Sequence, residues 1–213
     1  MHHFRKTGLI LGAVLFANSS FGAVSPSSVQ VTVYAVAVSQ YQDCSNPTIV
    51  GNYPEGQIFD FKQNPAIFNG TVPQGTYPCV ILQMSDVITF IPAESDGVSC
   101  VSGTTYSASV CRPSNSGQYT PMTISLNNAI TYGTTTACTG NDVVTTFIST
   151  LSTGVDGLAF LQPDEDNIGN GLTLGSPFIV SGTSAGTFVV DFDNQIASNG
   201  GNCTLNRPSM TFR

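Results

Sequence analysis

The clearest alternation of apolar and polar positions in the chain covers residues 28–39. Every second residue from 29 to 37 is Val or Ala, which places these side chains on one face of an extended strand. The other face is polar at Gln30 and Thr32 and becomes apolar from Tyr34 onward. We therefore predict a strand that is buried on both faces in its second half.

Short segments rich in β-branched and aromatic residues recur along the rest of the chain, between clusters of Gly, Pro and Asn. They are residues 57–61, 76–84, 87–91, 104–111, 122–126, 143–151, 157–162, 178–181, 186–192 and 209–212. A helix at 142–151 is one alternative, but its Val, Thr and Ile content favours a strand. The spacing is typical of an all-β protein, and we predict a disulfide-bonded antiparallel β-sandwich with long decorated loops.

The N-terminal segment has the features of a secretory signal peptide, in the usual order. Basic residues lie within positions 2–6, an apolar run covers 9–16, and small residues follow up to Ala23. We predict a signal peptide of bacterial type at residues 1–23, with cleavage after Ser19 as the alternative. Because the apolar run is shorter than the ~20 residues of a membrane-spanning helix, we expect no transmembrane span. The product would be secreted or periplasmic, or held at the cell surface.

Residues 24–213 then form the mature chain, which we expect to be a single domain. Composition changes give two alternative positions for one soft boundary, near 114–120 or near 132–141. Removal of the leader leaves four basic residues against thirteen acidic ones, a net charge of −9. Such an acidic surface repels phosphate backbones, so we expect no nucleic-acid partner.

The mature chain has no histidine, because His2 and His3 both lie in the leader. Histidine is the commonest general acid–base group and the commonest metal ligand. Lys62 is the one lysine of the mature chain, and none of the serines lies in a nucleophile or cofactor motif. We therefore predict a non-enzymatic protein with no cofactor other than the calcium ion considered below.

All six cysteines lie in the predicted mature chain, where an even number in an exported protein indicates disulfides. They are Cys44, Cys79, Cys100, Cys111, Cys138 and Cys203. Sequence alone leaves fifteen pairings open. We expect Cys100–Cys111 to close a short polar loop, and Cys44–Cys79 and Cys138–Cys203 to join distant strands.

A turn followed by an apolar strand covers residues 72–82. Pro73 favours a turn, Gly75 can take a positive φ, and Tyr77 can pack where the strand enters a sheet. This "P-x-G-x-Y then apolar strand" element resembles the transthyretin-like (prealbumin-type) β-sandwich modules of secreted and surface proteins. The resemblance implies a stalk, spacer or binding unit, and it transfers no catalytic residue. Pro78 and Cys79 depart from the pattern and predict an edge position or a kink.

The densest polar feature is a loop in which Asp164, Asp166 and Asn170 lie among turn-forming residues. Carboxylate and amide oxygens are the ligands that Ca²⁺ prefers, so these three residues form a candidate calcium site. The loop departs from an EF-hand, because Ile168 stands at the fifth position and Gly175 at the twelfth. A solvated acidic loop between two strands is the alternative interpretation.

Asp191 and Asp193 flank an aromatic residue in a predicted strand, so their carboxylates would lie on one face, about 6 to 7 Å apart. Paired carboxylates are the catalytic groups of glycoside hydrolases, although any acidic strand face gives the same spacing. Two other aspartates are expected to serve the fold. Asp60 would point outward between buried aromatic residues, and Asp86 would end a strand and cap a turn.

Three functions follow from these features. We expect an exported, non-enzymatic protein with a structural, adhesive or envelope- or surface-binding role and a protein or cell-surface partner. The strand at 29–38 could be donated to a second copy, which would give self-assembly. The first alternative is a calcium-assisted module that binds a carbohydrate or a surface. The second is a carboxylate-based glycan hydrolase.

Overall fold

The computed structural model describes residues 22–63, 72–111, 117–153, 158–181, 184–185 and 188–212. Every element of regular secondary structure assigned in these ranges is a β-strand, which confirms the predicted all-β class. No helix in the described ranges is long and apolar enough to cross a membrane. Most of the predicted leader, residues 1–21, lies outside the described residues.

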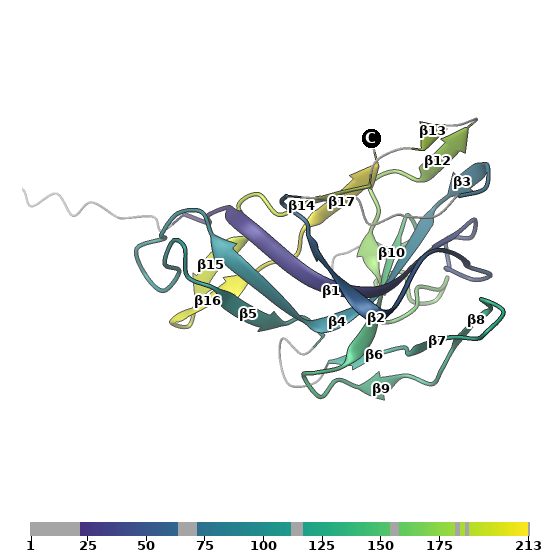
Figure 1. The fold of residues 1–213 in the computed structure, drawn as a ribbon, viewed down its shortest axis with the longest axis horizontal. Helices are drawn as coiled ribbons and strands as arrows, with labels where there is room; N and C mark the ends of the chain where they lie inside the picture. The colour runs from purple at the N-terminus through teal and green to yellow at the C-terminus, as the bar shows by residue number, and fades with distance from the viewer. Residues whose placement is uncertain are drawn as a thin grey trace, which may run out of the picture.

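The largest sheet has six strands and runs through the middle of the fold (Figure 1). Its strands are β1 (Pro26–Ser39), β2 (Thr48–Asp60), β4 (Cys79–Pro92), β5 (Tyr106–Ser109), β10 (Val143–Ser149) and β11 (Leu172–Thr173). The order is β11-β10-β4-β1-β2, and β5 pairs with β4 beyond the end of β10. All pairs are antiparallel except β10–β11.

Strand β1 lies inside this sheet, with β4 on one side and β2 on the other. It contains the segment 29–38 that the sequence suggests as a donated strand. Donation to a second copy would require both sets of pairs to open. The sheet also joins strands from before and after both positions of the soft boundary, since β10 and β11 follow residue 141.

The pairing of β1 with both neighbours shifts register next to Val33. Strand β1 itself has one extra residue, Tyr34, between its pairs Val33–Met84 and Ala35–Gln83 with β4. Strand β4 inserts residues 85–87 where β1 has a single residue, and β2 inserts residues 53–56 in the same way. Bulges of this kind bend the strands and increase their twist. They also break the strict alternation of side chains between the two faces of β1.

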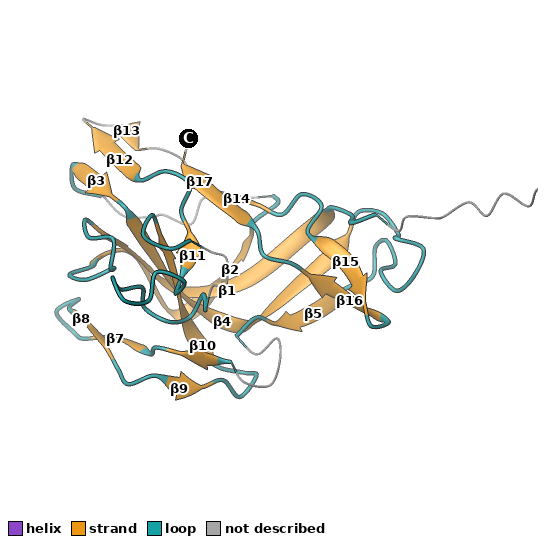
Figure 2. Cartoon of the chain, turned by 180° about the vertical axis from the view of Figure 1, so that it is seen from behind, coloured by secondary structure: helices purple, strands orange, loops and turns teal. Residues whose placement is uncertain are grey.

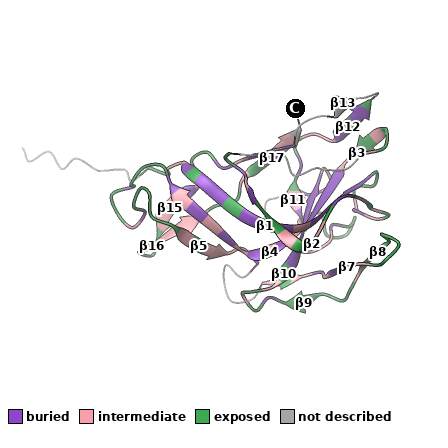
Figure 3. Cartoon of the chain, in the orientation of Figure 1, coloured by how far each residue is buried: buried purple, intermediate pink, exposed green. Residues whose placement is uncertain are grey.

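The bulge divides the apolar side chains of β1 between two cores. The side chains in the main core are Val29, Val31, Val33, Val36 and Val38. Ala35 and Ala37, which simple alternation places with Val33, belong to the second core on the other face. The face predicted for residues 29–37 is therefore wrong beyond the bulge. The predicted burial on both faces is confirmed, since residues 35–38 are fully buried. Figure 3 shows buried and exposed positions over the whole fold.

Small sheets lie around the central sheet (Figure 2). Several of their side chains belong to the two cores of the central sheet. The small sheets are formed by β3 (Gly75–Tyr77), β12 (Phe178–Ser181) and β13 (Ser184–Ala185), by β14 (Phe188–Asp191) and β17 (Ser209–Phe212), by β15 (Ile196–Asn199) and β16 (Asn202–Leu205), by β6 (Gln118–Tyr119) and β9 (Thr136–Ala137), and by β7 (Met122–Ile124) and β8 (Ile130–Tyr132). The covering layer is thus divided among short sheets, and the two-sheet sandwich remains a prediction.

The predicted turn and strand around Tyr77 form as two separate strands. The Tyr77 hydroxyl donates to the Pro73 carbonyl at 2.8 Å, and its ring lies 6.0 Å from that of Phe178. Pro78 separates β3 from β4, so the chain leaves a small sheet and enters the central one. The predicted kink at Pro78 is confirmed, whereas Gly75 does not take a positive φ. The transthyretin-like resemblance itself remains a prediction.

The other strand predictions differ in their outcome. Segments 178–181 and 209–212 match β12 and β17, and 143–151 contains β10. The strand predicted at 157–162 is wrong, because Leu158 forms only an isolated bridge and a turn follows it. The β15–β16 hairpin was missed, although Gly200 and Gly201, with φ of 57° and 82°, are typical of a two-residue hairpin turn.

Candidate binding site

An apolar cavity of about 260 Å³ lies between the central sheet and strands of the C-terminal part of the chain. One wall comes from the central sheet: Val31 of β1, Leu82, Met84 and Ile88 of β4, and Thr146 of β10. The main-core face of the bulged sheet therefore forms this wall.

The opposite wall comes from segments that are distant in sequence. Val190 of β14, the following Phe192 and Met210 of β17 contribute side chains, together with Phe160 from a turn. The ring of Phe192 lies 6.3 Å from the ring of Phe61, which also lines the cavity. The cavity thus forms where the C-terminal strands meet the central sheet.

The lining side chains that stay exposed mark the opening of the cavity. They are Gln118, Leu158, Asn206 and Arg207. Leu158 is 50% exposed. The opening therefore combines one exposed aliphatic side chain with amide and guanidinium groups, while the interior is apolar.

The interior of the cavity is suited to burying apolar groups. The described lining residues include no carboxylate, imidazole or amine, and Cys111 is held in a disulfide. The Thr146 hydroxyl donates to the Met84 sulfur at 3.4 Å. This lining can hold an apolar group, and it offers no side chain of the usual kind for proton transfer.

Asp86 fixes the part of the cavity wall that contains Val110 and Cys111. It is fully buried in the β4 bulge, and its carboxylate accepts hydrogen bonds from the Ser109 hydroxyl and the Cys111 backbone N–H, both at 2.7 Å. Its carbonyl accepts from the Val110 N–H at 2.9 Å, and its N–H donates to the Asp142 carbonyl at 2.8 Å. The prediction that Asp86 ends a strand is wrong, because it lies inside β4.

Asp96 organises the loop beside the second disulfide. The pKa of Asp96 lies below its ordinary value. The Ser198 hydroxyl and backbone N–H groups, including those of Val98 and Cys100, donate to its carboxylate and outweigh the opposite effect of burial. The same loop is joined to β16 by the Cys100–Cys203 disulfide. Covalent and charge-assisted contacts therefore attach this loop to the β15–β16 hairpin.

Asp60 is half-buried, and the rings of Phe59 and Phe61 on either side of it in the chain are buried. Burial alone would raise the pKa of Asp60. The Ser28 hydroxyl and the N–H groups of Lys62, Val29 and Gln63 donate to its carboxylate and lower the pKa below the ordinary value. The carboxylate closes the turn that follows β2.

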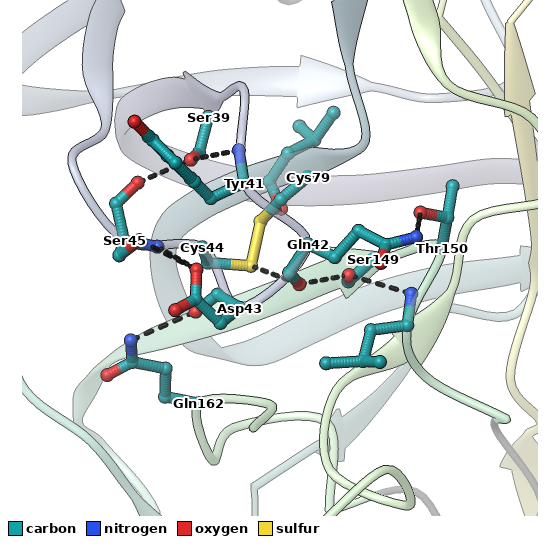
Figure 4. Close-up of a disulfide and its surroundings, with 12 residues drawn as sticks. Ser39, Tyr41, Gln42, Asp43, Cys44, Ser45, Cys79, Ser149, Thr150 and Gln162 are labelled. Atoms are coloured by element: carbon teal, nitrogen blue, oxygen red, sulfur yellow. Dashed lines mark hydrogen bonds between the residues drawn. A yellow bond between two sulfur atoms is a disulfide. The ribbon is translucent and has the colours of Figure 1, made fainter. Parts of the chain in front are cut away.

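The Cys44–Cys79 disulfide lies in a dense network of hydrogen bonds (Figure 4). The Ser149 hydroxyl donates to the Gln42 carbonyl, and Gln162 Nε2 donates to the Asp43 carbonyl at 3.0 Å. Cys44 has a φ of 61°, a conformation that these contacts hold in place. The loop between β1 and β2 is thus attached to the end of β10.

The disulfide pairings agree with the sequence prediction at one bond of three. Cys44 pairs with Cys79 as predicted. Cys100 pairs with Cys203 and Cys111 with Cys138, so the predicted Cys100–Cys111 and Cys138–Cys203 bonds are wrong. Sequence proximity misled here, because β5 separates Cys100 from Cys111.

The candidate calcium ligands lie in one exposed loop but have local partners. One Asp164 oxygen accepts from the N–H groups of Asp166 and Asn167, at 2.9 and 2.8 Å. The Asn170 side-chain nitrogen donates to the Gln162 carbonyl at 3.2 Å. Within the described residues no group of three or more His, Cys, Asp or Glu side chains could hold a metal ion. Calcium at this loop remains a prediction from the sequence.

The two candidate hydrolase carboxylates have separate partners. Strand β14 ends at Asp191, whose carboxylate accepts from the Asp193 N–H at 2.9 Å. The Asp193 carboxylate forms an ion pair with Lys62 at 2.6 Å. Asp193 therefore lies in the turn after the strand, and the prediction of one strand through both residues is wrong.

No protein-family model, curated protein or solved structure matches the chain. The cavity itself was missed from the sequence, since its lining consists of ordinary core residues. The lining residue that stands out in the sequence is Arg207, which lies beside Pro208 in the connection to the last strand. The spacing of residues along the chain does not relate Arg207 to a cavity.

Proposed function

We propose that the chain is an exported, non-enzymatic binding protein of the cell envelope or surface, and that an apolar ligand or an apolar group of its partner enters the cavity. The cavity is the observation that carries this proposal. A well-formed apolar pocket with a few polar groups at its edge is the usual form of a small-molecule site.

The size of the cavity supports a binding role. The cavity has a volume of about 260 Å³, and its lining is mostly apolar, so without a ligand this apolar surface faces the solvent that enters through the opening. An apolar ligand would gain dispersion contacts with the lining and remove apolar surface from water.

The use of the acidic residues supports a non-enzymatic role. The carboxylates of Asp43, Asp60, Asp86, Asp96, Asp142, Asp164, Asp191 and Asp193 accept hydrogen bonds or ion pairs from neighbouring loop and strand groups. These carboxylates stabilise turns, bulges and loops. The three disulfides indicate an oxidising environment, which suits export.

Thermal unfolding in the presence of 1-octanol tests the proposal. A ligand that binds only the folded state raises the Tm in a saturable way. We expect such a rise for the unaltered protein and its loss in Ala159→Leu and Val190→Phe, which add side-chain volume at the cavity lining. Ala129→Leu, on the exposed end of the β7–β8 hairpin, is the control. An octanol effect that is absent, or equal in all variants, would contradict the proposal.

A further inference from the structure

Three Asn–Gly pairs occur in the chain: Asn69–Gly70, Asn170–Gly171 and Asn199–Gly200. Because glycine has no Cβ, its backbone nitrogen can closely approach the side chain of the asparagine that precedes it. In such a pair the glycine nitrogen can attack the side-chain carbonyl carbon and release the side-chain amide as ammonia. Asn69–Gly70 lies outside the described residues. The surroundings of the other two pairs differ in the contacts made by the reacting groups.

Asn199–Gly200 lies at the exposed turn of the β15–β16 hairpin. Asn199 ends β15 and pairs with Asn202, and Gly200 and Gly201 form the turn between them. Apart from chain neighbours, no heavy atom would lie within 4 Å of a Cβ atom on either glycine. Among the described residues, the Asn199 side chain and the Gly200 N–H have no hydrogen-bond partner. Both reacting groups of this pair are therefore free to move.

Asn170–Gly171 is held at both reacting groups. The Asn170 side-chain nitrogen donates to the Gln162 carbonyl at 3.2 Å, and the Gly171 N–H donates to the Leu158 carbonyl at 3.0 Å. Gly171 is buried, and a Cβ atom there would lie 3.2 Å from the Phe147 carbonyl oxygen. Attack at this pair would require these contacts to break together.

We propose that Asn199 is a site of spontaneous deamidation in the folded protein, and that the fold protects Asn170. The Gly200 nitrogen loses its proton to a solvent base and bonds to Asn199 Cγ. The Cγ–Nδ2 bond breaks, and the amide takes up a proton and leaves as ammonia, which gives a cyclic imide. Water then opens the imide at Cγ to give aspartate, or at the main-chain carbonyl to give isoaspartate.

The end of a hairpin allows the movement that this reaction needs. The peptide between Asn199 and Gly200 must rotate, because the imide ring brings the Gly200 nitrogen to the Cβ side of Asn199. This rotation opens only the terminal pair of the ladder, Asn199 with Asn202, and terminal pairs open at low free energy. The Cys100–Cys203 disulfide keeps the rest of the hairpin attached while the turn opens.

Deamidation would change both the charge and the shape of the turn. Both products carry a carboxylate at position 199, so the chain, whose net charge is −7, becomes more acidic. Isoaspartate also takes the Cβ atom into the main chain. The added backbone atom disturbs the match between a two-residue turn and the twist of its strands.

Peptide mapping by mass spectrometry tests the inference on the purified protein, after incubation at 37 °C in mildly alkaline buffer. We expect Asn199 to convert about tenfold or more faster than Asn170, because the hairpin end opens more readily. Isoaspartate should form together with aspartate. In the reduced, urea-unfolded chain the two sites should convert at similar rates, since both are Asn–Gly pairs and the fold no longer separates them.

Matched variants assign the reaction to the Gly200 nitrogen. Gly200→Asp keeps a residue type that tolerates a positive φ and adds a side chain next to the attacking nitrogen, so conversion of Asn199 should slow about tenfold or more. Gly201→Asp adds the same side chain and charge one residue further along and should leave Asn199 reactive. Conversion of Asn170 should be unchanged in both variants.

Several results would overturn the inference. They are conversion of Asn170 as fast as that of Asn199 in the folded protein, aspartate at position 199 without isoaspartate, and unchanged conversion of Asn199 in Gly200→Asp. The comparison of Asn199 with Asn170 in the unaltered protein decides the matter even where a variant folds poorly. None of these results bears on the cavity, so the binding function proposed above stands or falls separately.

Discussion

Thr145 carries a hydroxyl that is buried in β10 and has no hydrogen-bond partner among the described residues. A buried polar group without a partner costs about 1 to 3 kcal/mol. Thr145→Val replaces the hydroxyl by a methyl group of similar size, so we expect the free energy of unfolding to rise by about 1 kcal/mol. Urea unfolding at equilibrium measures the change.

The neighbouring residue provides the control for this substitution. Thr146 is equally part of β10, but its hydroxyl donates to the Met84 sulfur. Thr146→Val should therefore give no gain in stability. A loss of stability in Thr145→Val would mean that its hydroxyl has a partner in solution.

Asp86 shows what a single residue type can and cannot indicate. An aspartate that follows a serine after an apolar segment predicts the end of a strand, because an unpaired buried carboxylate is costly. The donors that make burial acceptable come from Ser109 and Cys111, which are 23 and 25 residues away. Their position depends on the pairing of β5 with β4, and the sequence around Asp86 contains no signal for it.

At the scale of elements, the bulge of β2 brings Gly56 onto β1. Gly56 has a φ of 77°, and a Cβ atom there would lie 2.7 Å from Thr32 Cγ2 and 2.9 Å from Tyr34 Cε1. Gly103 has a similar φ of 73° with open space around it. We expect Gly103→Ala to cost about 1 to 2 kcal/mol from backbone strain alone. Gly56→Ala should cost at least about 1 kcal/mol more, because of the added crowding.

Thermal and urea unfolding of both variants distinguish the two effects. A similar loss of stability in Gly56→Ala and Gly103→Ala would show that β2 moves away from β1 easily. It would also mean that the bulge does not hold a fixed position. The alternation of apolar residues predicted β1 itself, whereas the bulge depends on how many residues its two neighbours insert.

At the scale of the whole molecule, the disulfides differ in the length of chain that they close. Cys100–Cys203 spans 103 residues, and Cys111–Cys138 spans 27. Loop-closure entropy in the unfolded chain gives about 4.7 kcal/mol of stabilisation for the longer loop and about 3.5 kcal/mol for the shorter one. Replacement of both cysteines by alanine should therefore destabilise the protein more at the Cys100–Cys203 bond.

Urea unfolding of the two double variants, with the remaining disulfides intact, measures this order. The reverse order would indicate that Cys111–Cys138 contributes mainly through the native state, where Cys111 lines the cavity and accompanies Asp86. In that case octanol binding should also be lost in the variant that lacks Cys111.

The sequence by itself determined the strand content and the burial of β1. Alternating Val and Ala residues, β-branched segments and Pro78 act through local backbone geometry, which neighbouring residues largely set. Only the tertiary structure decided the bulged register, two of the disulfide pairs, the burial of Asp86 and the cavity. Each of these depends on which distant segments meet and on the volume left between them, and identical residue types can pack with or without such a space.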